Sequence, residues 1–139
     1  MIRFLFFALL VLLLIQAGFA VANDAFGFAP ETRALAGRVH GPARVPPAVQ
    51  LAAWLLEATA LLALFLLVQG RSGAWWLDGL ATGWIAWVFR GPLLVFAVVA
   101  YGGLPRQPWW TLAFHWLAVY TLAGFSIALL ARWLKVERS

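Results

Sequence analysis

Three ionisable side chains lie inside stretches of this sequence that are otherwise apolar. Glu57 and Arg90 each fall near the middle of such a stretch, and His115 lies near the beginning of another. Placing a charged side chain at the centre of a bilayer costs roughly 2.5–3.5 kcal/mol, so residues of this kind need a structural or functional reason. They are therefore the first candidates for chemistry in this chain.

Glu57 and Arg90 can compensate each other's charge. A carboxylate and a guanidinium at matching depths on neighbouring helices can form an intramembrane ion pair, and arginine can hold a carboxylate through two parallel hydrogen bonds. We predict such a pair, with the joining of two helices as its main role. In the alternative interpretation, the same two residues serve a small transporter or channel that is built by oligomerisation.

His115 is a candidate ligand for haem or for the magnesium of a chlorophyll, and a candidate hydrogen-bond partner for a quinone. A bis-histidine haem would need a second histidine, and the only other one in the sequence is His40, in a loop. We therefore interpret His115 as hydrogen-bonded to a neighbouring helix or to interfacial water, and we predict no metal site and no cofactor. A redox or photosynthetic subunit that binds a pigment, haem or quinone through His115 is the alternative.

Other patterns that carry catalysis are missing from the sequence. It has no Ser-His-Asp set, no His-x-x-x-His, no glycine-rich phosphate loop and no pair of nearby carboxylates. It also has no cysteine, which excludes disulfides, thiol chemistry and cysteine metal sites. No motif that we associate with a known family is present. The sequence therefore favours a non-catalytic protein.

The elements that must position these residues are membrane helices. The 139 residues are 65% hydrophobic and only 11% charged, whereas soluble domains are about 25% charged. Crossing a bilayer takes about 20 apolar residues. Four stretches satisfy this length: 4–22, 48–69, 79–101 and 109–133. We predict an all-α, integral membrane four-helix transmembrane bundle as a single domain, with 23–47 as its long extramembrane loop.

Helix packing and helix ends are also marked in the sequence. Gly79 and Gly83, four residues apart, would let another helix backbone approach closely. Pro92 removes a backbone donor, which predicts a kink beside Arg90 and an interior position for it. Four tryptophans at the expected borders are predicted to be interfacial anchors: Trp75, Trp76, Trp109 and Trp110.

The N-terminal span and the long loop each allow two interpretations. Ala20-Val21-Ala22 after an apolar run is similar to a signal-peptide cleavage site. Cleavage there would leave three helices, and we favour the interpretation in which the first helix is retained. Within the loop, residues 30–40 form either a short helix on the membrane surface or an irregular segment.

Charge placement bears on partners and orientation. The net charge is +5, but the ten basic residues are scattered among helix ends and loops, so we predict lipid contacts and no nucleic acid. The cluster of Arg132, Lys135 and Arg138 favours cytoplasmic N and C termini.

Our leading hypothesis is an accessory or structural subunit of a larger membrane complex, in contact with other membrane-protein subunits. The sequence uses arginine in preference to lysine, which is typical of GC-rich bacterial genomes and favours a bacterial inner membrane.

Overall fold

The computed structural model describes residues 1–26, 46–102 and 106–136. All regular structure in these residues is helical. The elements are α1 (Ile2–Phe26), α3 (Pro47–Val68), α4 (Trp75–Val88), the π-helical turn η1 (Phe89–Leu93), α5 (Leu94–Gly102) and α6 (Arg106–Trp133). The surface helix considered for residues 30–40, and His40 with it, lies outside the described residues.

Four helical segments are long and apolar enough to cross a membrane. They are Ile2–Ala22, Pro47–Val68, Trp75–Tyr101 and Trp109–Trp133. The third runs continuously through α4, η1 and α5. The prediction of an all-α bundle of four membrane helices is therefore confirmed, and the protein is membrane-embedded.

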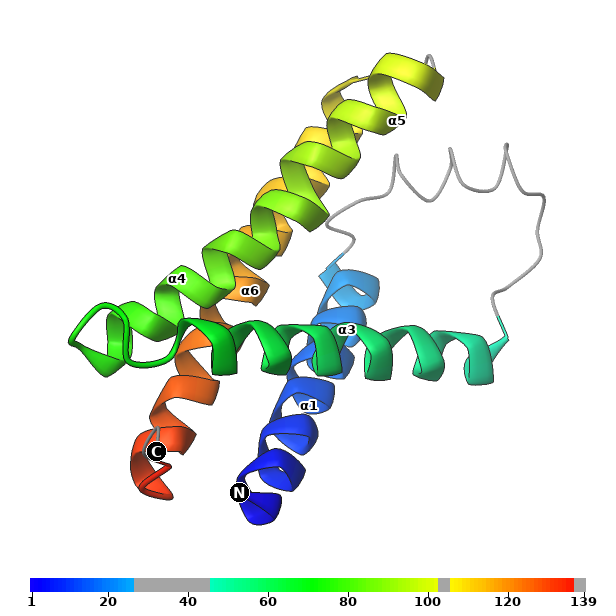
Figure 1. Ribbon diagram of the computed structural model, residues 1–139. Helices are drawn as coiled ribbons and strands as arrows, with labels where there is room; N and C mark the ends of the chain where they lie inside the picture. The colour runs from blue at the N-terminus through cyan, green and yellow to red at the C-terminus, as the bar shows by residue number, and fades with distance from the viewer. Residues whose placement is uncertain (27–45, 103–105, 137–139) are drawn as a thin grey trace.

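The helices are arranged around α6. The span made of α4, η1 and α5 lies alongside α6, and α1 packs against both α6 and α3. Figure 1 shows α3 running across α1 and α6 instead of along them, and it shows the two chain ends at the same end of the bundle. Because α3 crosses its neighbours, it can bring one of its side chains to the π-helical turn.

The contact between α4 and α6 is made at glycines. Gly79 and Gly83 of α4 are buried against Gly124 of α6. A Cβ at Gly79 would lie 2.7 Å from the Cβ of Ala128, and a Cβ at Gly83 would overlap the carbonyl oxygen of Tyr120. The absence of side chains at these glycines therefore allows the two backbones to approach closely, as lipid-embedded helices require when van der Waals packing drives their association.

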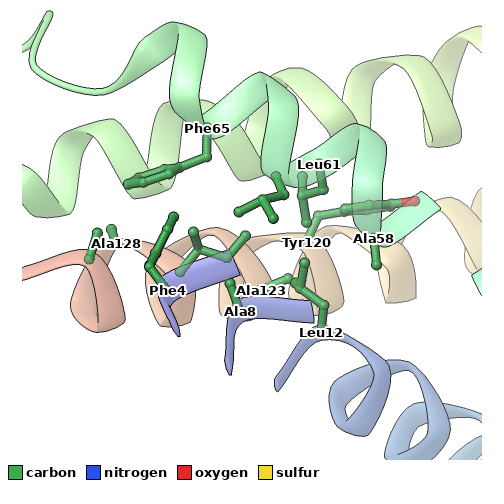
Figure 2. Packing of buried hydrophobic residues seen from close by; sticks show 12 residues of the cluster. Phe4, Ala8, Leu12, Ala58, Leu61, Phe65, Tyr120, Ala123 and Ala128 are labelled. Carbon is green, nitrogen blue, oxygen red and sulfur yellow. The ribbon is translucent and has the colours of Figure 1, made fainter. Parts of the chain in front are cut away.

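The buried apolar cluster joins α1, α3 and α6 (Figure 2). Phe4 of α1 and Phe65 of α3 are almost completely buried, and their ring centroids are 6.2 Å apart. Leu12 of α1 and Ile127 of α6 are equally inaccessible. The first span is thus an integral part of the packed core in this structure.

The turn between α3 and α4 is organised by Asp78. This side chain is 4% exposed and accepts hydrogen bonds from the backbone N–H groups of Gly70, at 2.6 Å, and Ser72, at 3.2 Å, as well as from the Ser72 hydroxyl. Helix α4 begins at Trp75, four residues earlier than predicted, because Asp78 lies in its first turn and folds back onto the connection.

The irregularity predicted at Pro92 takes the form of the π-helical turn η1. Proline has no N–H to donate within the helix and its ring crowds the preceding turn, so a wider turn accommodates it. Gly91 is buried in this turn, where a Cβ would lie 2.8 Å from the indole nitrogen of Trp87. That indole donates a 2.7 Å hydrogen bond to the Ala113 carbonyl of α6, which ties the end of α4, just before the turn, to α6.

Candidate intramembrane binding site

The structure brings Glu57 and Arg90 together. Glu57 extends from α3 and Arg90 from η1, and the Arg90 Nε lies 3.8 Å from the Glu57 Oε1. This distance is an ionic contact but is too long for a hydrogen bond. The Arg90 side chain is 49% exposed and that of Glu57 is 28% exposed. The pair is therefore not a sealed, doubly hydrogen-bonded bridge.

Two aromatic residues of α6 complete the cluster around this pair. The Tyr120 hydroxyl donates a hydrogen bond to the Glu57 Oε1. The Arg90 guanidinium lies over the Trp116 ring, 4.9 Å from its centroid, within the range of a cation–π interaction. Trp116 and Tyr120 are four residues apart and so share a face of α6. Sequence reasoning did not connect either residue with this ion pair.

The cluster forms part of the wall of a cavity between α1, α3 and α6, with a volume of about 420 Å³. Glu57, Arg90 and Tyr120 line it together with two glutamines, Gln16 of α1 and Gln50 of α3. The remaining lining is aromatic or aliphatic: Leu12, Ile15, Phe19, Ala20, Trp54, Leu112, Trp116, Val119 and Ala123. This is the composition of a ligand site, mostly apolar with a few polar groups.

Gln16 contributes a buried polar atom to this cavity. Its Oε1 is inaccessible and has no hydrogen-bond partner within the described part of the chain. A buried acceptor without a partner is costly in a low-dielectric interior. Because Gln16 lines the cavity, rotation of its amide would bring this oxygen to a donor group on a bound molecule, which would remove the cost.

A second cavity lies on the other side of the same cluster. It has a volume of about 320 Å³ and is also lined by Glu57, Arg90 and Tyr120. Its other lining residues are apolar and come from α3, α4 and η1: Ala60, Leu61, Leu64, Ala86 and Phe89. The cluster thus borders one partly polar cavity and one apolar cavity.

His115 lies apart from this cluster. It is half-buried on α6 and lines neither of the two cavities. Among residues 1–26, 46–102 and 106–136, no group of three His, Cys, Asp or Glu side chains is placed to hold a metal ion.

The predicted tryptophan anchors differ in how deeply they are buried. Trp75 is half-buried, packs against Phe125 with ring centroids 5.3 Å apart, and lies beneath the Arg132 guanidinium at 5.2 Å. Trp76 and Trp110 are 44% and 39% exposed, and Trp109 is half-buried. Trp75 therefore packs within the bundle, whereas Trp76 and Trp110 present more of their rings outward.

Comparison with protein-family models, with curated proteins and with solved structures gives no match. The fold and the cluster together define a helical membrane protein with a charged pair on the wall of a partly open cavity. That geometry is therefore the basis for a functional proposal.

Proposed function

We propose that this chain is a membrane protein that binds a small amphipathic molecule in the cavity between α1, α3 and α6. The observation that carries the proposal is that Glu57, Arg90 and Tyr120 line that cavity. An ion pair that served only to join helices would be expected in a close-packed contact. Here the Arg90 side chain is half-exposed, and the Glu57 Oε1 lies 3.8 Å from its Nε, too far for a hydrogen bond. This contact therefore leaves N–H donors of the guanidinium, which has five, for another acceptor.

The chemistry of the lining limits the ligand. The Arg90 guanidinium would bind an oxygen acceptor on the head group of the ligand, and the Gln16 Oε1 would accept a hydrogen bond from a donor on it. Trp54 and Trp116 provide flat apolar surfaces for the body of the molecule. These features fit a carboxylic acid, a phenol or a quinol with an apolar ring or chain, at a size typical of small-molecule pockets.

The test is to purify the protein in a mild detergent, extract it with organic solvent and identify the released small molecules by mass spectrometry. Gln16→Leu is the most informative variant, because it removes the unpartnered oxygen while retaining an apolar side chain in α1. We expect this variant to fold as well as the wild type and to lose most of the bound molecule. Thr59→Ala, an exposed position on α3 that lines neither cavity, is the matched control. Equal release from wild type and Gln16→Leu would refute the proposal.

We further propose that the chain acts as an accessory subunit of a larger membrane complex in a bacterial inner membrane. Large apolar side chains of the α4–α5 span face outward, among them Trp84, Phe89 and Phe96, which are 56%, 67% and 66% exposed. Lipid or another subunit would cover them. Isolation in mild detergent, followed by identification of copurifying membrane proteins, tests this role. Recovery of the chain alone at stoichiometric purity would count against it.

A transporter or channel is the second candidate function, and one observation favours it. Glu57, Arg90 and Tyr120 line both cavities. Residues that form a gate between two compartments would be placed in this way. The apolar lining of the second cavity favours binding over the passage of a polar solute. Flux of a carboxylic acid into proteoliposomes that Arg90→Gln abolishes would establish transport in place of simple binding.

We propose no metal-centred cofactor at His115. A visible spectrum of the purified protein provides the test, with His115→Ala as the comparison variant. A Soret or chlorophyll band that disappears in His115→Ala would overturn this proposal and favour a redox or photosynthetic subunit.

A further inference from the structure

A third cavity, of about 550 Å³, lies at the end of the bundle where α6 ends. It is bounded by the α3–α4 connection and by the C-terminal end of α6. Arg132 and Lys135 line it, together with the ring of Trp75. Phe65, Ala128 and Ala131 add apolar surface. The cavity therefore combines two cations with an aromatic ring at a helix end, where an aromatic side chain would meet the lipid head groups.

The position of Lys135 is conformationally unusual. Helix α6 ends in a Schellman motif, in which the Val136 N–H donates to the Ala131 carbonyl at 3.0 Å and the Lys135 N–H donates to the Arg132 carbonyl at 3.2 Å. Lys135 itself has a φ of 50°, in the left-handed region that glycine usually occupies at this position. A lysine stands where glycine would be easier to accommodate, so its ammonium group is a candidate for a role of its own.

The other groups around the cavity leave its positive charge available. The Arg132 guanidinium lies over the Trp75 ring. Asp78 also lines the cavity, but its oxygens already accept the hydrogen bonds of Gly70 and Ser72. Among the described residues that line the cavity, two cations therefore face one carboxylate that is occupied by the turn.

The shape of the cavity is fixed by a contact between two helix ends. The Gln69 side-chain amide donates a 2.7 Å hydrogen bond to the Val136 carbonyl, which joins the end of α3 to the residues that follow α6. Trp75, which also lines the cavity, packs against Phe125 of α6. The site is thus built by residues from three segments of the chain.

We propose that this cavity binds the phosphate head group of an anionic phospholipid through Arg132 and Lys135. A phosphodiester matches the two cations, and its acyl chains would continue along the apolar surface of the bundle. The apolar lining and the tryptophan favour a lipid over a free phosphate ion. This site is separate from the cavity at Glu57 and does not depend on the function proposed for it.

The experiment compares lipids and variants in detergent solution. The purified protein is titrated with phosphatidylglycerol, phosphatidylcholine or inorganic phosphate, and bound lipid is counted by native mass spectrometry. Lys135→Gly is the principal variant, because glycine suits the left-handed position and the fold should be kept. Arg71→Gln is the matched control, since it also removes one positive charge but lies exposed on the same connection, outside the cavity lining.

We expect phosphatidylglycerol to bind in preference to phosphatidylcholine, and Lys135→Gly to weaken that binding about five-fold, as expected for the loss of one basic side chain at a membrane surface. Arg71→Gln should bind like the wild type. If Lys135→Gly folds poorly, Lys135→Gln gives the same comparison. Equal weakening in Arg71→Gln, equal binding of phosphatidylcholine, or Lys135-dependent competition by millimolar inorganic phosphate would each overturn the proposal.

Discussion

The Arg90 guanidinium lies 3.8 Å from the Glu57 carboxylate, and this contact joins α3 to the π-helical turn that contains Pro92. Within this turn, the Arg90 side chain contacts Glu57 of α3 and lies over the Trp116 ring of α6. One side-chain pair thus links three segments of the bundle and borders a cavity. Its energetic role and its binding role can be separated by mutation.

A double-mutant cycle measures the energetic role. Glu57→Leu leaves a guanidinium that keeps its charge and should destabilise the fold more than Arg90→Leu, which leaves a carboxyl that a proton can neutralise. Because the pair is partly exposed, we expect the larger loss at or below the lower end of about 3–5 kcal/mol, the range for fully buried pairs. Thermal unfolding in detergent provides the measurement. Strict additivity of the two single variants would show that the residues do not interact.

The hydroxyl of Tyr120 should contribute separately from its ring. Tyr120→Phe keeps the buried ring but removes the donor to Glu57, and hydrogen bonds to charged groups contribute about 1.5–3 kcal/mol. We expect the loss of this hydrogen bond to lower the midpoint of thermal unfolding of Tyr120→Phe. Tyr101→Phe is the matched control, since Tyr101 is 90% exposed. An equal change in the unfolding midpoint of both variants would show that the Tyr120 hydroxyl does not stabilise the cluster.

Hydropathy predicts the spans because a bilayer demands about 20 apolar residues from each helix, whatever its partners are. Helix ends depend on local contacts that hydropathy does not contain, and the early start of α4 at Trp75 follows from the hydrogen bonds of Asp78 to Gly70 and Ser72. Gly124 has Ala128 four residues later, a small-residue spacing that could have identified it as a helix-contact position on α6.

The candidate site is less accessible to sequence reasoning. Glu57 and Arg90 are conspicuous because charge is rare inside apolar spans. Trp116 and Tyr120 have the right spacing to share a helix face, but such pairs are common in a chain that is 16% aromatic. The cavity itself depends on how α3 crosses α1 and α6, and no local pattern determines a crossing. Gln16, one residue in a long apolar helix, acquires its importance only from that crossing.

Membrane topology gives an independent prediction. The two chain ends lie at the same end of the bundle, and the basic residues Arg132 and Lys135 lie close to the C-terminal one. We expect reporters fused after residue 136 and inserted between residues 27 and 45 to report opposite sides of the membrane, with the C-terminal fusion cytoplasmic. Alkaline phosphatase and green fluorescent protein fusions provide the two complementary signals. Signals from the same side would contradict the three crossings between this loop and the C terminus, and with them the four-span prediction.

The glycine contact between α4 and α6 gives the sharpest prediction about packing. A Cβ at Gly83 would overlap the carbonyl of Tyr120, and that neighbour is backbone, so it cannot rotate away as a side-chain end could. Gly83→Ala must therefore separate the two helices, at a cost of about 1–3 kcal/mol or more. Separation would also shift Tyr120, the donor to Glu57, so loss of the bound molecule should accompany the loss of stability.

Gly18 provides the matched control for that substitution. It lies in α1, and the position that an added methyl group would occupy has no neighbouring atom within 4 Å. Gly18→Ala should therefore be neutral, or stabilising by about 0.5–1 kcal/mol from the reduced freedom of the unfolded backbone. Thermal unfolding in the same detergent compares the two alanines, which add the same group to different surroundings. The expected order is Gly18→Ala at or above the wild type and Gly83→Ala well below it. If Gly83→Ala unfolds at the wild-type temperature, α4 and α6 do not approach as closely as the glycines allow, and the position of Tyr120 beside Glu57 loses its structural basis.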